Sequence, residues 1–410
     1  MWYGRRGYQP QDQSIIFDGG WRTLKGQVPL RDYVTPSGIL PSLMQGGLFK
    51  LLGVSWRTYC LHAAILNVLF CVLVYVVLSR LRTARLVALA LAVGSSLIFY
   101  APFGVPYMEQ HAFFFVLLAT WILVESSTRQ SGRVRAFGYV SVPVIVGLAA
   151  LSKQLPTVFF PPVALALVLL VDRRPASALK FLGVGTIATG AILLALISAF
   201  HIPLGDVIYY MVKLPLTGAL PQRGVVASIV PLPRWRLVAP SVTYGGVLSV
   251  LLFTALPDRR RNGRRVLIPS LSARVLALFV GVAIVVGAGF LASVPDRGVF
   301  AATLGGVVAA TCAFVVLLCW ASSAVPVLSL NRIVRAQLIL GGGLLLVCAL
   351  FTSATNNELE NGIPFDFLTA GLVLAALTGI VTSLVSGRRR RIALTCIGCV
   401  FLGAVLVDAG

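Results

Sequence analysis

Carboxylates are scarce in this sequence, and their positions are informative for that reason. Only 13 of the 410 residues are Asp or Glu, and most of them lie in short polar segments between long apolar runs. An ionised carboxylate within hydrogen-bond reach of a hydroxyl or an amine can act as a general base. A lysine or arginine in the same segments can bind phosphate. The candidates for these roles are the carboxylates Asp18, Asp32 and Glu109 and the cations Lys153, Arg22 and Arg31.

Signatures of the common soluble enzymes do not occur in the chain. There is no P-loop, no HExxH and no GxSxG sequence. The three histidines, His62, His111 and His201, are too dispersed in the sequence to suggest a metal site. Cys396 and Cys399 have CxxC spacing, but their segment is apolar and free cysteine packs as a small hydrophobe. We therefore expect no metal site and no cofactor, and leave a divalent metal as an open alternative.

The composition indicates an integral membrane protein. Hydrophobic residues make up 58% of the chain and charged residues 11%, against about 25% charged in a typical soluble domain. Apolar runs long enough to cross roughly 30 Å of hydrocarbon recur along the sequence, for example at 59–78, 86–104, 273–292 and 299–320. The pattern predicts an all-α fold with about twelve transmembrane helices.

The formal charge of +21 does not indicate a nucleic-acid partner, because the basic residues alternate between loops. Loops rich in lysine and arginine stay on the cytoplasmic side of a membrane, where they meet anionic lipid head groups. We therefore expect anionic lipids as partners of these loops, and no nucleic acid. The basic clusters are Arg80, Arg82 and Arg85; Arg129, Arg133 and Arg135; Arg173, Arg174 and Lys180; Arg259 to Arg261, Arg264 and Arg265; Arg332 and Arg335; and Arg388 to Arg391.

The remaining loops should then face outward, and most of the carboxylates fall in them. The predicted outer loops are 104–111, 152–155, 201–236, 293–298 and 353–366, preceded by the region 1–58. An outward region 1–58 with several basic residues needs a helix before it, so we expect a transmembrane helix upstream of Met1. The outer carboxylates are Asp12, Asp18, Asp32, Glu109, Asp206, Asp296, Glu358, Glu360 and Asp366.

The pattern of residues in region 1–58 differs from that of the polytopic region 59–410. We expect a short helix at 18–25, a loop broken by glycine and proline at 26–38, and an apolar helix at 40–52. Trp21, Tyr33 and Trp56 favour the membrane interface. The sequence thus predicts an amphipathic helix-loop-helix that lies along the outer membrane surface.

Three stretches of the sequence, 15–53, 105–110 and 147–154, resemble parts of the GT-C glycosyltransferases, membrane enzymes that use polyprenyl-phosphate sugars. The string IIFDGGWRTLKGQVPLRDYVTPSGILPSLMQGGLFKLLG is similar to their first external loop, where an acidic residue precedes an amphipathic helix and a proline-glycine turn. GLAALSKQ at 147–154 is similar to an element that ends a short middle helix, and Glu109 stands where the family tends to carry another acid. The matches cover roughly residues 15–170. Here the usual acidic pair is a single Asp18 followed by two glycines.

The resemblance implies a polyprenyl-phosphate sugar donor and transfer with inversion to a lipid, glycan or protein acceptor. Transfer would take place at the outer face of a multi-pass protein in the cell (inner) membrane. Asp18 would be the catalytic base, with Asp32 and Glu109 as further acids of the site. Lys153 would hold the donor phosphate, assisted by Arg22 and Arg31.

Each assignment has a structural alternative. Asp18 can be a helix N-cap or first-turn residue, Asp32 a turn residue, and Glu109 a solvated loop charge. Lys153 can extend to the membrane interface, and the two arginines can bind head groups. A transporter or flippase of lipid-linked material is the rival function, and it predicts repeated halves and ionisable residues within the spans.

The alternation of basic loops can be tested by labelling. Single cysteines placed in the six basic loops of a cysteine-free chain should be protected from a membrane-impermeant maleimide added from outside. Cysteines in the outer loops should react. Strong outside labelling in two or more basic loops would overturn the predicted topology. The six loops are those around Arg80, Arg129, Arg173, Arg259, Arg332 and Arg388.

Overall fold

A computed structural model describes residues 13–35, 38–99, 104–128, 132–158 and 160–214, with isolated residues from 333 to 347 and residue 372. The chain forms two compact units, Met1–Val225 with Val347–Leu368, and Val226–Leu346 with Thr369–Gly410. Almost all described residues belong to the first unit. In the second, the described residues between 333 and 344 are helical.

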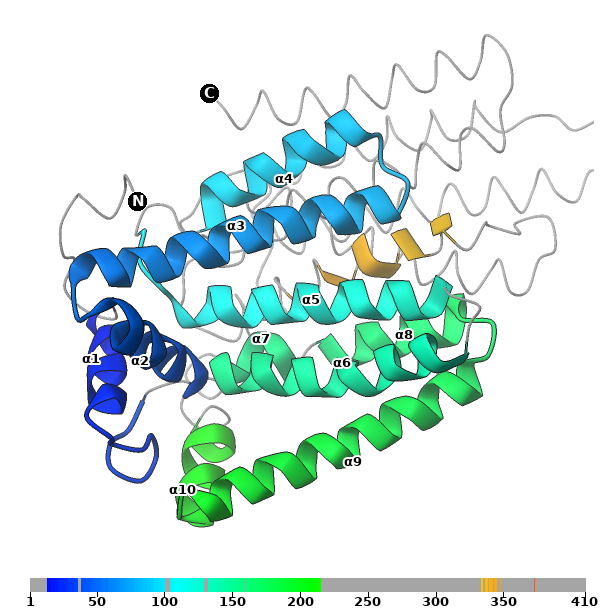
Figure 1. Cartoon of the computed structure of the whole chain (residues 1–410). Helices are drawn as coiled ribbons and strands as arrows, with labels where there is room; N and C mark the ends of the chain where they lie inside the picture. The colour runs from blue at the N-terminus through cyan, green and yellow to red at the C-terminus, as the bar shows by residue number, and fades with distance from the viewer. Residues whose placement is uncertain are drawn as a thin grey trace, which may run out of the picture. The chain divides into compact units, whose positions relative to one another are not determined.

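The described part of the first unit is entirely helical, without a strand (Figure 1). The region 1–58 contributes two helices to it, and these belong to the same compact unit as the helices that follow. The helices are α1 (Gln13–Leu24), α2 (Leu40–Leu52), α3 (Trp56–Arg80), α4 (Arg85–Phe99), α5 (Met108–Thr128), α6 (Gly132–Ser152), α7 (Gln154–Val158), α8 (Phe160–Val171), α9 (Pro175–Ala199), α10 (Leu204–Ile208) and the π-helical turn η2 (Tyr209–Lys213).

Four of the described helices, α3, α5, α6 and α9, are long and apolar enough to cross a bilayer. Their lengths of 21 to 25 residues match the thickness of the hydrocarbon core. The apolar helices α4 and α8 are shorter. The described part of the chain is therefore that of an all-α membrane protein, as the composition predicts. Most of the other predicted spans, including 273–292 and 299–320, lie outside the described residues.

The predicted helix-loop-helix is present, with one changed boundary. α2 has the predicted limits, whereas α1 extends to Gln13 and is therefore longer than the expected helix at 18–25. Two glycines of α1 let the helices approach closely. A Cβ atom at Gly19 would lie 2.3 Å from the Ser42 hydroxyl, and one at Gly20 would lie 2.5 Å from Cγ of Gln45. These glycines are therefore packing residues.

The loop between α1 and α2 is attached to the end of α6. The backbone amide of Gly38 donates to the carbonyl oxygen of Ser152 at 3.1 Å. A Cβ atom at Gly38 would lie 1.9 Å from the Leu151 carbonyl oxygen, so only glycine fits there. Tyr33 holds the other side of the loop, because its hydroxyl donates to the Gly19 carbonyl at 3.0 Å.

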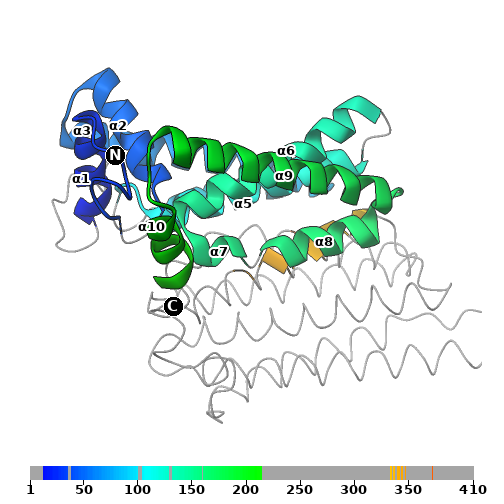
Figure 2. The same ribbon diagram turned by 90° about the horizontal axis from the view of Figure 1, so that it is seen from below.

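The helix ends gather at two opposite ends of the unit (Figures 1 and 2). At one end, the Arg80 guanidinium at the end of α3 lies 2.7 Å from the Glu125 carboxylate near the end of α5. At the other end, α1 and α2 lie beside the start of α3, and the Arg31 guanidinium donates to the Phe200 carbonyl after α9 at 3.1 Å. The basic clusters around Arg80 and Arg135 thus lie opposite the helix-loop-helix.

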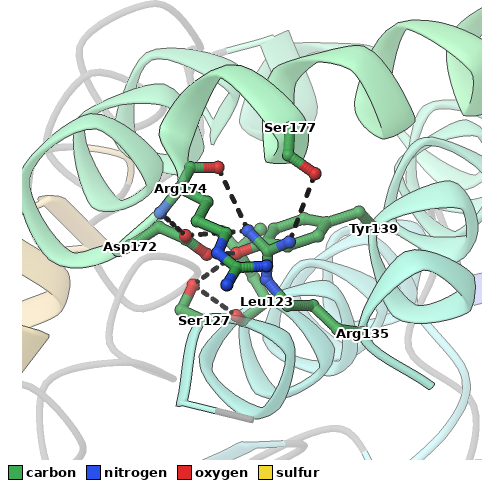
Figure 3. Close-up of polar contacts among 7 residues, drawn as sticks. All are labelled: Leu123, Ser127, Arg135, Tyr139, Asp172, Arg174 and Ser177. Carbon is green, nitrogen blue, oxygen red and sulfur yellow. Dashed lines mark hydrogen bonds and ion pairs between the residues drawn. The ribbon is translucent and has the colours of Figure 1, made fainter. Parts of the chain in front are cut away.

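A buried polar cluster joins α6 to the turn between α8 and α9 at the basic end (Figure 3). Arg135 pairs with Asp172 at 2.8 Å, and their side chains are 10% and 1% exposed. Asp172 also accepts a hydrogen bond from the Tyr139 hydroxyl, which lies 3.0 Å from the hydroxyl of Ser127 on α5. The alternation of basic clusters predicts a loop at Arg135. That was wrong, because α6 begins at Gly132 and carries Arg135 into contact with Asp172.

Gly38→Ala should destabilise the protein, because the added methyl group meets a backbone carbonyl that cannot rotate away. Overpacking of this kind costs about 1–3 kcal/mol or more. Gly47→Ala is the matched control, since a Cβ atom there meets nothing within 4 Å and alanine favours a helix interior. Thermal unfolding in detergent should show a lower midpoint for Gly38→Ala alone. Equal midpoints would contradict the close approach.

Candidate functional site

The candidate site lies where α1 and α2 meet the first turns of α3 and α5 and the end of α6. All six residues proposed from the sequence belong to α1, the loop after it, the start of α5 or the end of α6, and these elements lie at this end of the unit (Figure 1). Their contacts join them into three pairs: Asp18 with Arg22, Asp32 with Arg31, and Glu109 with Lys153. The pairs differ in burial and therefore in what they can do.

Asp18 is an accessible carboxylate in the second turn of α1. Its side chain is 55% exposed, and the Arg22 guanidinium donates to Oδ2 at 2.7 Å. This i, i+4 pair is at the surface and contributes about 0–1 kcal/mol. Because the helix begins at or before Gln13, Asp18 is neither an N-cap nor a first-turn residue. The capping alternative is therefore wrong.

Asp18 lines two adjoining cavities on the helix-loop-helix. The larger, of about 400 Å³, has aromatic walls, and the smaller, of about 220 Å³, lies between α1 and the following loop. An apolar wall with a few polar groups is typical of small-molecule sites. The larger cavity is lined by Ser14, Phe17, Asp18, Trp21, Val54 and Trp56.

The residues before Asp18 anchor α1 to the bundle. Phe17 packs edge-on against Phe49 of α2 and Tyr59 of α3, with ring centroids at 4.9 and 5.3 Å. Ile16 is 2% exposed, in a cluster with Tyr59 and Met108. Burial of these side chains fixes the exposed face of α1, and Asp18 lies on that face.

Asp32 is bound on several sides and is a poor candidate for a base. Arg31 donates to both of its carboxylate oxygens, at 2.9 and 2.8 Å, and the Val28 amide donates to Oδ2 at 2.8 Å. The bonds from Arg31, and then that from Val28, lower the pKa of Asp32 to about 2. A carboxylate with so low a pKa accepts a proton weakly. These contacts favour a loop-fastening role for Asp32 and Arg31.

Glu109 and Lys153 form a buried ion pair between α5 and the end of α6. The Lys153 ammonium donates to Glu109 Oε1 at 2.8 Å, and the side chains are 18% and 2% exposed respectively. The alternative of a solvated loop charge at Glu109 is therefore wrong, because α5 begins at Met108 and carries Glu109 in its buried first turn. Two of the predicted site residues are thus in direct contact.

Two of the histidines also meet at this site, although they are 49 positions apart. Nε2 of His62 on α3 lies 3.0 Å from Nε2 of His111 on α5. Nδ1 of His62 lies 2.9 Å from the Gln45 side-chain amide on α2, and Nδ1 of His111 lies 2.6 Å from the Tyr107 carbonyl oxygen. Their wide separation in the sequence gave no indication of this contact. The sequence did hold one signal for this contact, because each histidine is a polar residue within the first two turns of an apolar helix.

No third ligand joins the two histidines. Among the described residues, no group of three or more His, Cys, Asp or Glu side chains is placed to hold a metal ion. Neither cavity beside Asp18 is lined by Glu109 or Lys153, so this end of the unit offers an exposed carboxylate beside an aromatic cavity and, apart from it, a lysine held by a buried glutamate. Such groups suit proton abstraction and the binding of an anion.

Comparison with known proteins places the chain in no family. No family model, no curated protein and no solved structure matches it.

The Glu109–Lys153 pair should show strong coupling in stability. Removing one partner of a buried pair leaves an uncompensated charge, at a cost of about 3–5 kcal/mol, whereas removing both is far less costly. We expect Glu109→Gln and Lys153→Met each to lower the free energy of unfolding. The double variant should recover much of the loss, so the coupling energy should reach about 3 kcal/mol, as large as the loss in one single variant. Additive effects in denaturant unfolding would show that the pair does not form.

Proposed function

We propose that this chain is a membrane glycosyltransferase of the GT-C type, which transfers a sugar from a polyprenyl-phosphate donor to a lipid, glycan or protein acceptor. The observation that carries the proposal is the exposed carboxylate of Asp18 in the wall of an aromatic cavity of about 400 Å³. The resemblance of the strings at 15–53 and 147–154 to the GT-C enzymes supports it.

Asp18 is the proposed general base. The acceptor hydroxyl or amine attacks the anomeric carbon as the bond from that carbon to the phosphate oxygen breaks, and Asp18 takes the acceptor proton. The polyprenyl phosphate leaves with the electron pair of the broken bond, and attack opposite to it inverts the anomeric centre. The exposed carboxylate is open to an acceptor, because Arg22 occupies one side of it only as a surface pair.

Lys153 is the proposed partner of the donor phosphate. An ammonium group has three N–H donors, and the bond to Glu109 uses one of them. Its partial exposure of 18% leaves room for a second anion. Glu109 then holds the lysine in place, and Arg22 is a further phosphate contact near Asp18. The contacts of Arg31 and Asp32 favour the support of the loop over a direct role.

The proposed orientation follows from charge. The end opposite the site carries the basic clusters around Arg80 and Arg173, which favour the cytoplasmic side. The site then faces outward from the cell (inner) membrane, with α1 and α2 at the outer interface. We propose about twelve spans for the whole chain, on the hydropathy of the sequence.

The rival function, a transporter or flippase of lipid-linked substrates, is favoured by one observation. Glu109, His62 and His111 are buried within helices that are candidate spans, and ionisable groups inside spans often mark transport pathways. They lie in the first two turns of their helices, at one end of the unit. That position fits an interfacial site better than a pathway across the membrane.

Asp18→Asn is the decisive variant, because the amide keeps the shape but cannot take a proton at neutral pH. A positioned general base contributes about 10²–10⁴-fold, so release of polyprenyl phosphate from short-chain polyprenyl-phosphate hexoses and pentoses should fall by that factor. Expression should hold, since only a surface ion pair of about 0–1 kcal/mol is lost. Asp206→Asn, another carboxylate of this end on α10, should retain activity.

A near wild-type rate for Asp18→Asn would remove Asp18 as the base and make Asp32 the next residue to test. A wild-type protein that releases no polyprenyl phosphate, yet moves the labelled lipid between the leaflets of vesicles, would establish the flippase instead.

A further inference from the structure

A chain of buried hydrogen bonds runs from the start of α5 through α3 to α2. It links the Tyr107 carbonyl, His111, His62 and the amide of Gln45. The two rings meet edge to face, with centroids 4.8 Å apart. His111 and Gln45 are fully buried and His62 is 2% exposed. These groups therefore depend on one another for hydrogen bonding.

The position of each hydrogen follows from the acceptor at the Tyr107 end. A carbonyl oxygen only accepts, so Nδ1 of His111 carries the hydrogen and its Nε2 accepts from Nε2 of His62. Nδ1 of His62 then has a lone pair, and the group opposite it must donate. A doubly protonated ring would instead bury a charge among apolar helices at high cost. Gln45 is thus the donor.

The structure places Oε1 of Gln45 toward Nδ1 of His62, so the deduction requires the Gln45 amide to be turned over. With Oε1 toward His62, Gln45 Nε2 is buried and, within the described part of the chain, has no hydrogen-bond partner. Turning the amide over places Nε2 against His62 Nδ1, so that one N–H of Gln45 donates to His62 and the N–H of each ring reaches an acceptor. The direction of donation is therefore Gln45 to His62 to His111 to Tyr107.

The Gln45 side chain held in this way is in contact with α1. A Cβ atom at Gly20 would lie 2.5 Å from Gln45 Cγ and 2.8 Å from its Cβ, so the glutamine packs on the backbone two residues after Asp18. At the far end, Tyr107 precedes α5, whose first turn carries Glu109. The hydrogen-bond chain thus spans the distance between the helix of Asp18 and the helix of Glu109.

We propose that His62 and His111 are positioning residues that, through Gln45, hold Asp18 at a fixed place relative to the Glu109–Lys153 pair. The predicted effect of the histidines on turnover rests on the proposed function. Their predicted effect on the position of α1 does not depend on any activity.

Two substitutions of His111 separate positioning from general stability. His111→Asn places an amide nitrogen near the former Nδ1 and keeps the bond to Tyr107, but it is too short to reach His62. His111→Gln reaches His62 with an acceptor and gives up the bond to Tyr107. Both put a neutral amide in the same buried place, so a merely structural role predicts equal effects. Thr120→Val, a buried change two turns further along α5, is the control.

Hydrogen-deuterium exchange of the α1 amides is the first measurement. His111→Asn should speed exchange at Gly19–Leu24 about fivefold or more, whereas His111→Gln and Thr120→Val should stay within about twofold of wild type. Gln45→Met should match His111→Asn, because methionine keeps the contact with Gly20 but cannot donate to His62. Equal exchange in the two His111 variants would overturn the proposal. If His111→Asn does not fold, Gln45→Met with unchanged exchange would overturn it as well.

Kinetics with the polyprenyl-phosphate sugars that the wild type uses is the second measurement. His111→Asn should lower kcat about tenfold or more and leave KM for the donor within about twofold, since Lys153 is untouched. Equal changes in both constants would contradict positioning of Asp18. Should the wild type prove to be no transferase, the proposed function fails, while the exchange data still decide whether the hydrogen-bond chain holds α1.

Discussion

The need to pair every polar group that an apolar bundle buries governs the described part of this chain. A charge or an amide away from water costs several kcal/mol unless it finds a partner. The helices therefore meet around polar contacts: Arg135 with Asp172 at one end, and Glu109 with Lys153 and His62 with His111 at the other. Each contact joins a helix to another helix or to a helix end, and so it limits how far these elements can slide against one another.

Close backbone approach adds a second constraint at the site. Gly19 and Gly20 bring α1 against α2, and Gly38 brings the intervening loop against the end of α6. Here the space next to Asp18 is filled by Ser42 and Gln45 of α2. As a result, α1 carries one carboxylate, Asp18, on its exposed face.

The proposed site therefore consists of two unlike halves. Asp18 is exposed beside Trp21 and Trp56, as a group must be if it is to meet an acceptor from outside. Lys153 is shielded and held by Glu109, as suits a cation that must meet a single anion in a fixed place. The contrast between an exposed base and a shielded cation favours an enzyme at the membrane surface. The buried histidines are the feature that would also suit a transport protein.

The sequence by itself determined the helical membrane fold, the limits of α2 and the end of the unit to which Asp18, Glu109 and Lys153 belong. Hydrophobic length and charge act locally along the chain, so a pattern of residues suffices to predict them. Only the tertiary structure decided that Glu109 is buried and paired, that Arg135 lies inside a helix, and that His62 meets His111 across 49 positions. Partners of this kind come from different helices, and which side chains face each other depends on helix rotation and packing, which no single segment encodes.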